Sequence, residues 1–186
     1  MTKYMAPALA LLVALSGCAN LTGDTGSNDR GLDGIPCVGT VVSTAEGLAE
    51  STNSSLLGKA QMPTGKGGVC SAKVFAATAP VVLYRVFDAS KPYTKFGVWW
   101  SLKRPGNSKV DYRSENAICP EWSNLDRLTH CEIRPGTQVV LGTTQSAICA
   151  DGSLFAKTAA IQVFVPNDGR DGIIHVGACA EDSSWP

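Results

Sequence analysis

Histidine and charge are scarce in this sequence, and both shortages narrow the possible functions. The chain has two histidines among its 186 residues, and 16 Lys+Arg balance 16 Asp+Glu. Charged residues make up 17% of the chain, against about 25% in a typical soluble domain. Nucleic-acid-binding domains carry a clustered excess of basic residues. The composition therefore argues against nucleic acid as a partner.

Motifs of the common enzyme classes are also absent. The sequence has neither a G-x-S-x-G elbow nor a phosphate-binding G-x-x-x-x-G-K-[ST] loop. It has no C-x-x-C or H-x-x-x-H spacing, so no metal site is predicted. The two histidines, His130 and His175, suit structural or surface positions better than catalytic ones. A hydrolase that uses His175 remains the weakest of three functional hypotheses.

The N-terminus has the pattern of a bacterial lipoprotein signal peptide. Lys3 supplies the positive charge, and the apolar run from Ala6 to Leu15 is shorter than the ~20 residues that span a bilayer. Small residues then lead to a cysteine in Leu15-Ser16-Gly17-Cys18, which resembles the lipobox of lipoprotein signal peptidases. We expect residues 1–17 to be removed and Cys18 to carry the lipid.

The lipid on Cys18 predicts an exported protein anchored in a membrane. Ala19 follows the cysteine where Asp would favour retention, so a Gram-negative cell is expected to sort the protein to its outer membrane. Gly, Asp, Asn, Ser and Thr dominate residues 19–36, which contain too little apolar surface to fold alone. We therefore interpret residues 18–36 as the lipidated cysteine and a tether, and residues 37–186 as a single globular domain.

Six cysteines remain for the domain and, in an exported chain, they predict disulfides. They are Cys37, Cys70, Cys119, Cys131, Cys149 and Cys179. Six cysteines allow 15 connectivities, and the sequence alone does not choose among them. Pairing neighbours along the chain, 37 with 70, 119 with 131 and 149 with 179, is our working hypothesis.

The pattern of apolar residues predicts short strands and one or two short helices. A short helix is expected near residues 43–50, with loop over residues 51–69. The apolar pattern that predicts strands begins at residue 79. Strands are predicted at 80–87, 96–102, 131–133, 138–142, 160–165 and 172–176. Turns are predicted at 135–136 and 166–169. The result is an α+β domain with a mainly antiparallel or mixed sheet.

One helix is predicted in the middle of the domain, with Asn107 or Ser108 as its N-cap. Its expected apolar face contains Val110, Ser114, Ala117 and Ile118. Pro120 is expected to end it, and residues 124–128 to form a further short helical turn.

Three polar residues interrupt apolar strands and are the best candidates for a site. Arg85 lies in the strand PVVLYRVF, Ser101 follows two tryptophans, and Gln162 lies in AIQVFV. An unpaired buried charge is costly, so Arg85 needs a carboxylate or a cleft in which its planar fork can bind phosphate. An outward-facing edge position would explain each residue singly, whereas three on separate strands favour a site.

The stretch from Tyr84 to Pro166 resembles the bacterial toxin-type domains with an ADP-ribosyltransferase-like or NAD-glycohydrolase-like fold. The resemblance covers roughly 80 of the 186 residues. The matching segments are, in order, Tyr84-Arg85-Val86, Gly97, Trp100-Ser101, Tyr112-Arg113, residues 117–124 (AICPEWSN), Pro135-Gly136-Thr137, Gly142 and residues 162–166 (QVFVP).

The resemblance assigns a role to each candidate. It implies that Arg85 contacts the phosphate or ribose of NAD, that Ser101 shapes the nicotinamide-ribose pocket, and that Gln162 stabilises the oxocarbenium-like ribose. Further substrate contacts are expected from Tyr84, Trp100 and Arg113. NAD is thus the expected substrate, and an immunity protein is a possible partner.

Gln162 also separates two reactions within the family. True transferases have Glu at this position, and an amide is a poor base for activating a protein acceptor. Hydrolysis of NAD is therefore favoured over ADP-ribosyl transfer. The alternative from a different class is a non-catalytic cell-envelope lipoprotein that uses the domain as a binding module.

Overall fold

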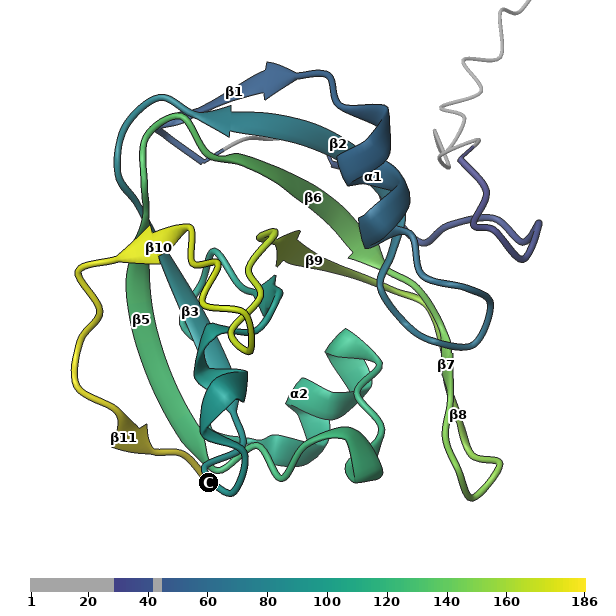
Figure 1. Ribbon diagram of the computed structural model, residues 1–186. Helices are drawn as coiled ribbons and strands as arrows, with labels where there is room; N and C mark the ends of the chain where they lie inside the picture. Colours follow the sequence, from purple (N-terminus) through teal and green to yellow (C-terminus); the bar gives the residue numbers. More distant parts are fainter. Residues whose placement is uncertain (1–28, 42–44) are drawn as a thin grey trace, which may run out of the picture.

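The computed structural model describes residues 29–41 and 45–186 (Figure 1). The segment predicted to be a signal peptide, and Cys18, the predicted lipidation site, lie outside the described residues. Residues 29–36, expected to belong to the tether, contact the domain. Lys157 Nζ lies 2.8 Å from Asp33 Oδ1, and the Ser71 hydroxyl donates to Asp29 Oδ2. Within the described ranges, no helix combines the length and apolar character needed to cross a membrane.

A five-stranded antiparallel sheet forms one layer of the fold, in the order β1-β2-β6-β9-β4 (Figure 1). Its strands are β1 (Leu48–Ser51), β2 (Val69–Ala77), β6 (Gln138–Thr144), β9 (Thr158–Phe164) and β4 (Trp99–Trp100). Phe75, Leu141 and Val163 are fully buried on the face that meets the second sheet.

The second layer is built on β5 (Arg127–Ile133). β3 (Val81–Phe87) pairs with β5 along its whole length, and two short strands, β10 (Val176–Gly177) and β11 (Ser183–Ser184), complete the sheet. Leu83 and Ile133 of this sheet share one core cluster with the first sheet. A backbone bridge between Tyr84 and Ser101 connects the two layers. β7 (Ala147–Ile148) and β8 (Leu154–Phe155) form a separate hairpin.

Two short helices complete the α+β fold, which confirms the coarse prediction. α1 (Ser54–Ala60) begins at Asn53, whose side chain accepts from Leu56 N, and its apolar side covers the first sheet. α2 (Lys109–Asn116) begins at Ser108, as predicted, with Ser108 Oγ accepting from Asp111 N at 3.2 Å. Two 3₁₀ segments, η1 (Pro92–Phe96) and η2 (Pro120–Trp122), lie in loops.

The predicted apolar face of α2 is wrong for Val110 and Ser114, whereas Ala117 is buried and Ile118 packs against the core just beyond the end of the helix. The Val110 side chain is 74% exposed, and Ser114 is exposed as well. The helix instead turns Tyr112, Arg113 and Asn116 toward the protein, where Tyr112 packs against an apolar cluster that contains Leu128 and Trp185. The helix ends at Asn116, four residues before Pro120, because the next residue, Ala117, takes a left-handed φ of 49°.

Several other predicted elements need correction. The segment expected to be helical near 43–50 holds β1, which pairs with β2, and the expected loop 51–69 contains α1. β2 was missed altogether because small residues dilute its apolar pattern. Residues 124–128, expected to be a helical turn, instead lead into β5. The strand predicted at 96–102 is reduced to β4, and η1 occupies its first residue, Phe96.

One of the three predicted disulfides is confirmed. Cys37 pairs with Cys70, but the other bridges join Cys119 to Cys149 and Cys131 to Cys179. The predicted pairs 119–131 and 149–179 are therefore wrong. Sheet pairing explains the difference: β10 pairs with β5, which brings the segment after β10 to Cys131 in β5.

Candidate functional site

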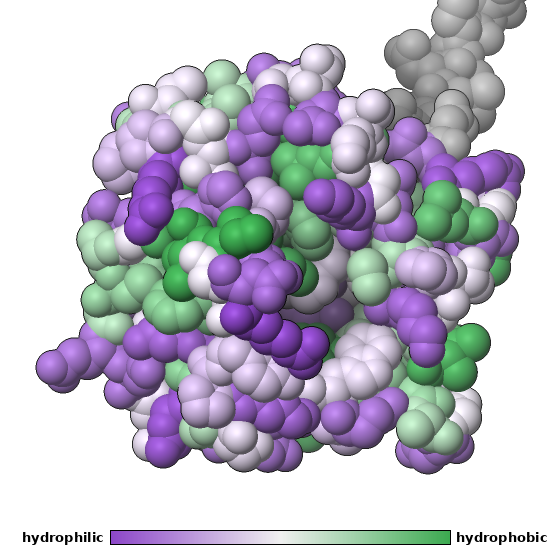
Figure 2. Space-filling view, viewed as in Figure 1, coloured by the Kyte–Doolittle hydropathy of each residue, from purple (hydrophilic) through white to green (hydrophobic). Residues whose placement is uncertain are grey.

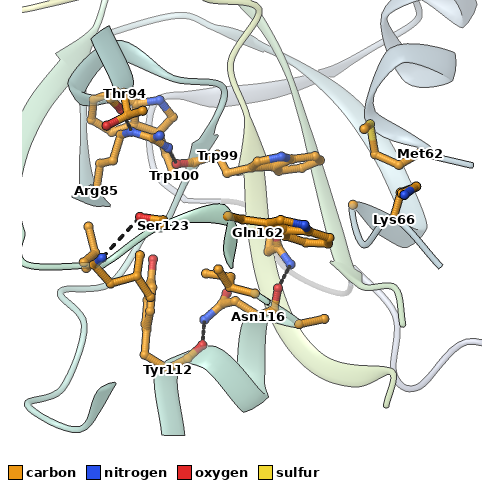
Figure 3. Close-up of a pocket in the computed structure, with 16 residues that line it drawn as sticks. Met62, Lys66, Arg85, Thr94, Trp99, Trp100, Tyr112, Asn116, Ser123 and Gln162 are labelled. Atoms are coloured by element: carbon orange, nitrogen blue, oxygen red, sulfur yellow. Dashed lines mark hydrogen bonds between the residues drawn. The ribbon is translucent and has the colours of Figure 1, made fainter. Parts of the chain in front are cut away.

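A cavity of about 350 Å³ lies between α2, β3, β4 and β9. Figure 2 shows that this face of the molecule is hollowed near its centre, above α2 as placed in Figure 1. We call this cavity the aromatic cavity. The polar and aromatic residues in its lining include Arg85, Trp99, Trp100, Tyr112, Asn116 and Gln162. In Figure 3, Arg85, Thr94 and Trp100 lie on one side, Met62 and Lys66 on the other, and Tyr112 and Asn116 reach in from α2.

Arg85 reaches this cavity from β3 as a cation without a counter-ion. Its Nε donates to Thr94 O at 2.6 Å, and Nη1 donates to Trp99 O. The guanidinium lies 5.8 Å from the Trp100 ring centroid. No described carboxylate lies within ion-pair distance of it. Burial lowers the pKa of Arg85 to about 10, so the side chain stays positively charged at neutral pH.

The sequence makes room for this guanidinium by placing glycine at position 97. A Cβ on Gly97 would lie 2.2 Å from Arg85 Nη2, closer than any real contact. Any larger residue would displace either the arginine or the loop. Gly97 O also accepts from Trp100 Nε1 at 2.8 Å, which fixes the neighbouring indole.

Gln162 presents a hydrogen-bond acceptor to the cavity. Residues 161, 163 and 165 pack into the core between the sheets, so the alternation along β9 turns Gln162 to the opposite face. Its Nε2 donates to Thr144 Oγ1 at 2.9 Å. It also donates to Asn116 O at 3.2 Å, as Figure 3 shows. Both amide hydrogens are thus used. No described residue donates to Oε1, and this oxygen is not sealed from the cavity.

Tyr112 forms the boundary between this cavity and a second one. Burial raises the pKa of the Tyr112 phenol, while a hydrogen bond with Ser101 and the charge of Arg85 act in the opposite direction. The phenol is therefore neutral at physiological pH. The ring packs edge-on against Trp185, with centroids 5.2 Å apart. Ser101 itself lines the second cavity, of about 740 Å³, and not the first.

The remaining expected substrate contacts lie differently. Trp100 lines the cavity, but Tyr84 does not and packs beside His130. Arg113 donates to three backbone carbonyls of the 118–123 loop, the shortest bond being 2.6 Å to Ser123 O. Its hydrogen bonds therefore hold the cavity wall.

The sequence analysis assigned no site role to several residues that line the cavity, among them Met62, Lys66, Thr94 and Asn116. Asn116 follows Tyr112 by four residues, so the two share a helix face, and this spacing was the available signal. Neither histidine lines the cavity. Cys119, Glu121 and Cys149 lie within metal-binding reach of one another, but the two sulfurs form a disulfide and offer no thiolate.

Comparisons with known proteins do not assign the chain to a family. No protein-family model matches it, and no curated protein is significantly similar in sequence. The solved structure of Tne2 in complex with Tni2 resembles it with a TM-score of 0.47 and 14% identity, over 62% of this chain and 93% of that one. This likeness is too distant to carry an inference about function.

Proposed function

We propose that the domain has an ADP-ribosyltransferase-like fold, binds NAD in the aromatic cavity and hydrolyses its nicotinamide–ribose bond. The observation that carries the proposal is Arg85, a cation without a described counter-ion that, with Lys66 on the opposite side, gives a largely apolar and aromatic cavity a positive charge. A partly buried arginine in this setting gains most from an anionic ligand such as a phosphate. The indoles beside it suit a flat heteroaromatic ring.

Each group has a defined role in the proposed reaction. Arg85 binds the phosphate next to the nicotinamide ribose, and Trp99 packs against the nicotinamide. Gln162 Oε1 accepts a hydrogen bond from a ribose hydroxyl, and this bond strengthens as positive charge develops on the ribose. The bond between ribose C1′ and the ring nitrogen breaks, and its electron pair leaves with nicotinamide. Water adds to C1′ and releases one proton, giving ADP-ribose.

Hydrolysis fits this cavity better than transfer to a protein. Among the described residues that line it there is no aspartate or glutamate. An acceptor side chain would need such a base for activation, whereas a strongly electrophilic oxocarbenium-like ribose reacts with water directly. The absence of a carboxylate among the described lining residues also supports a second candidate function, a non-catalytic module that binds a nucleotide.

The proposed setting is a lipoprotein anchored through Cys18. A protein that destroys NAD endangers the cell that makes it, so we also propose a partner that blocks the cavity, in the manner of an immunity protein. Acylation is tested by mass spectrometry of the protein from cells that export it, with Cys18→Ala as the control.

Nicotinamide release by the full oxidised chain tests the proposed reaction. Arg85→Ala and Gln162→Ala are compared with Arg134→Ala and Gln138→Ala, whose parent side chains hydrogen-bond away from the cavity. Thermal unfolding verifies that all four are folded. We expect release by the wild type and the two controls only. Binding of NAD without release supports the non-catalytic module, and absence of binding refutes the proposal.

A further inference from the structure

A second cavity adjoins the aromatic one and shares a wall with it. The 740 Å³ space is lined by the loop from Ser101 to Gly106, by α2 and by the start of β9. Tyr112 and Asn116 line both cavities. Arg85 lines only the first cavity and Ser101 only the second. The two spaces are therefore next to each other along this side of α2.

The second cavity has an excess of positive charge. Lys103 and Arg104 both line it, and Glu115 is the one acidic residue among its described lining groups. None of these three side chains forms an ion pair with a described residue. Lys103 and Arg104 are exposed, adjacent in sequence and not ion-paired with Glu115, so their side chains can donate to an anionic ligand in this space.

The sizes of the two cavities suggest how one ligand would use both. Small-molecule sites measure about 300–1,000 Å³, so the aromatic cavity of about 350 Å³ is at the lower end. It suits a base with its ribose. A dinucleotide placed there must extend beyond it, and the cationic side of the shared wall is the direction that favours phosphate.

We infer that Lys103 and Arg104 bind the phosphate-bearing second half of a dinucleotide whose first nucleoside occupies the aromatic cavity. The phosphates then pass along Tyr112 and Asn116, between Arg85 on one side and the two cations on the other. This inference rests on the proposed function and makes the site selective for a dinucleotide over a single nucleoside.

Equilibrium binding to the full oxidised chain tests this inference, with NAD and nicotinamide riboside as probes. The variant Lys103→Ala/Arg104→Ala is compared with Lys59→Ala/Lys73→Ala. The second variant also removes two positive charges, but from residues that line neither cavity. We expect the first variant to bind NAD about tenfold or more weakly, as loss of charge-assisted hydrogen bonds implies. Its affinity for the riboside, which has no phosphate, and the NAD affinity of the control should stay unchanged.

The outcomes separate this inference from the proposed function. If the wild type binds NAD but the two double variants bind it equally well, the second cavity is not a phosphate site, and NAD binding at Arg85 stands. An equal loss of riboside and NAD affinity would place Lys103 and Arg104 at the first nucleoside and also overturn the inference. If the wild type binds neither probe, the proposed function fails and the inference fails with it.

Discussion

The Cys119–Cys149 disulfide stabilises both the fold and the wall of the aromatic cavity, which gives a sharp prediction. Cys119 directly follows Ile118, a cavity residue, and precedes Trp122 and Ser123 on the same wall. The Cys37–Cys70 disulfide offers a matched comparison. Its sequence separation is 33 residues, against 30 for the other bridge, and Cys37 lies outside the cavity wall.

Chain entropy predicts nearly equal stability losses for the two bridges. For closed loops of about 30 residues, removing a disulfide lowers the free energy of unfolding by about 3.6 kcal/mol, and the difference in loop length changes this by less than about 0.1 kcal/mol. All four sulfur positions are buried, so replacement of each pair by alanine removes a comparable volume.

Ligand binding should distinguish the two double variants. Without its disulfide, the 118–123 loop keeps the hydrogen bonds from Arg113 but loses its covalent attachment to the β7–β8 hairpin. We therefore expect Cys119→Ala/Cys149→Ala to bind NAD more weakly than the wild type at a temperature where it is fully folded. Cys37→Ala/Cys70→Ala should bind NAD normally under the same conditions.

Urea unfolding followed by far-UV circular dichroism measures the stability loss, and calorimetric titration of the folded variants measures binding. Equal NAD affinities in the two double variants would show that the disulfide does not shape the cavity. A stability loss below about 1 kcal/mol in either variant would contradict the entropic reasoning.

Three further predictions concern the fold. Hydrogen bonds, first that of the Ser90 hydroxyl, lower the pKa of Asp88 to about 2. The ionised carboxylate therefore stabilises the protein above pH ~4, and this contribution of at most about 2 kcal/mol is lost as the pH falls toward 2. In urea unfolding from pH 2 to 5, the free energy of unfolding should depend less on pH for Asp88→Asn than for the wild type. Leu141→Ala should cost about 2–5 kcal/mol because the side chain is fully buried, while Val110→Ala should change stability by less than about 0.5 kcal/mol; equal midpoints in chemical denaturation would contradict the assigned core. Ser108→Ala should cost about 1 kcal/mol through loss of the α2 cap, and an unchanged melting temperature would argue against this helix start.

Local sequence patterns were reliable where a single strand or cap determines its own structure. The β-branched run at 80–87 predicted β3, and a polar residue before the helical pattern predicted the Ser108 cap. Local patterns failed at β2, whose small residues become strand because β1 and β6 pair with it on both sides. They also failed for part of α2, because hydropathy favoured Val110 for the buried side, whereas the helix packs Tyr112 against an apolar cluster and leaves Val110 exposed.

By itself, the sequence determined the α+β class and the presence of disulfide-forming cysteines. It also showed that two polar residues, Arg85 and Gln162, interrupt apolar strands. Each of these follows from composition or from short-range periodicity. Tertiary structure alone decided which cysteines pair, because pairing depends on which strands become neighbours. It also decided that Arg85 meets no described carboxylate and that Gln162 Oε1 remains open to the cavity while Ser101 lies across the Tyr112 wall. These are distances between residues far apart in the chain, and no local pattern encodes them.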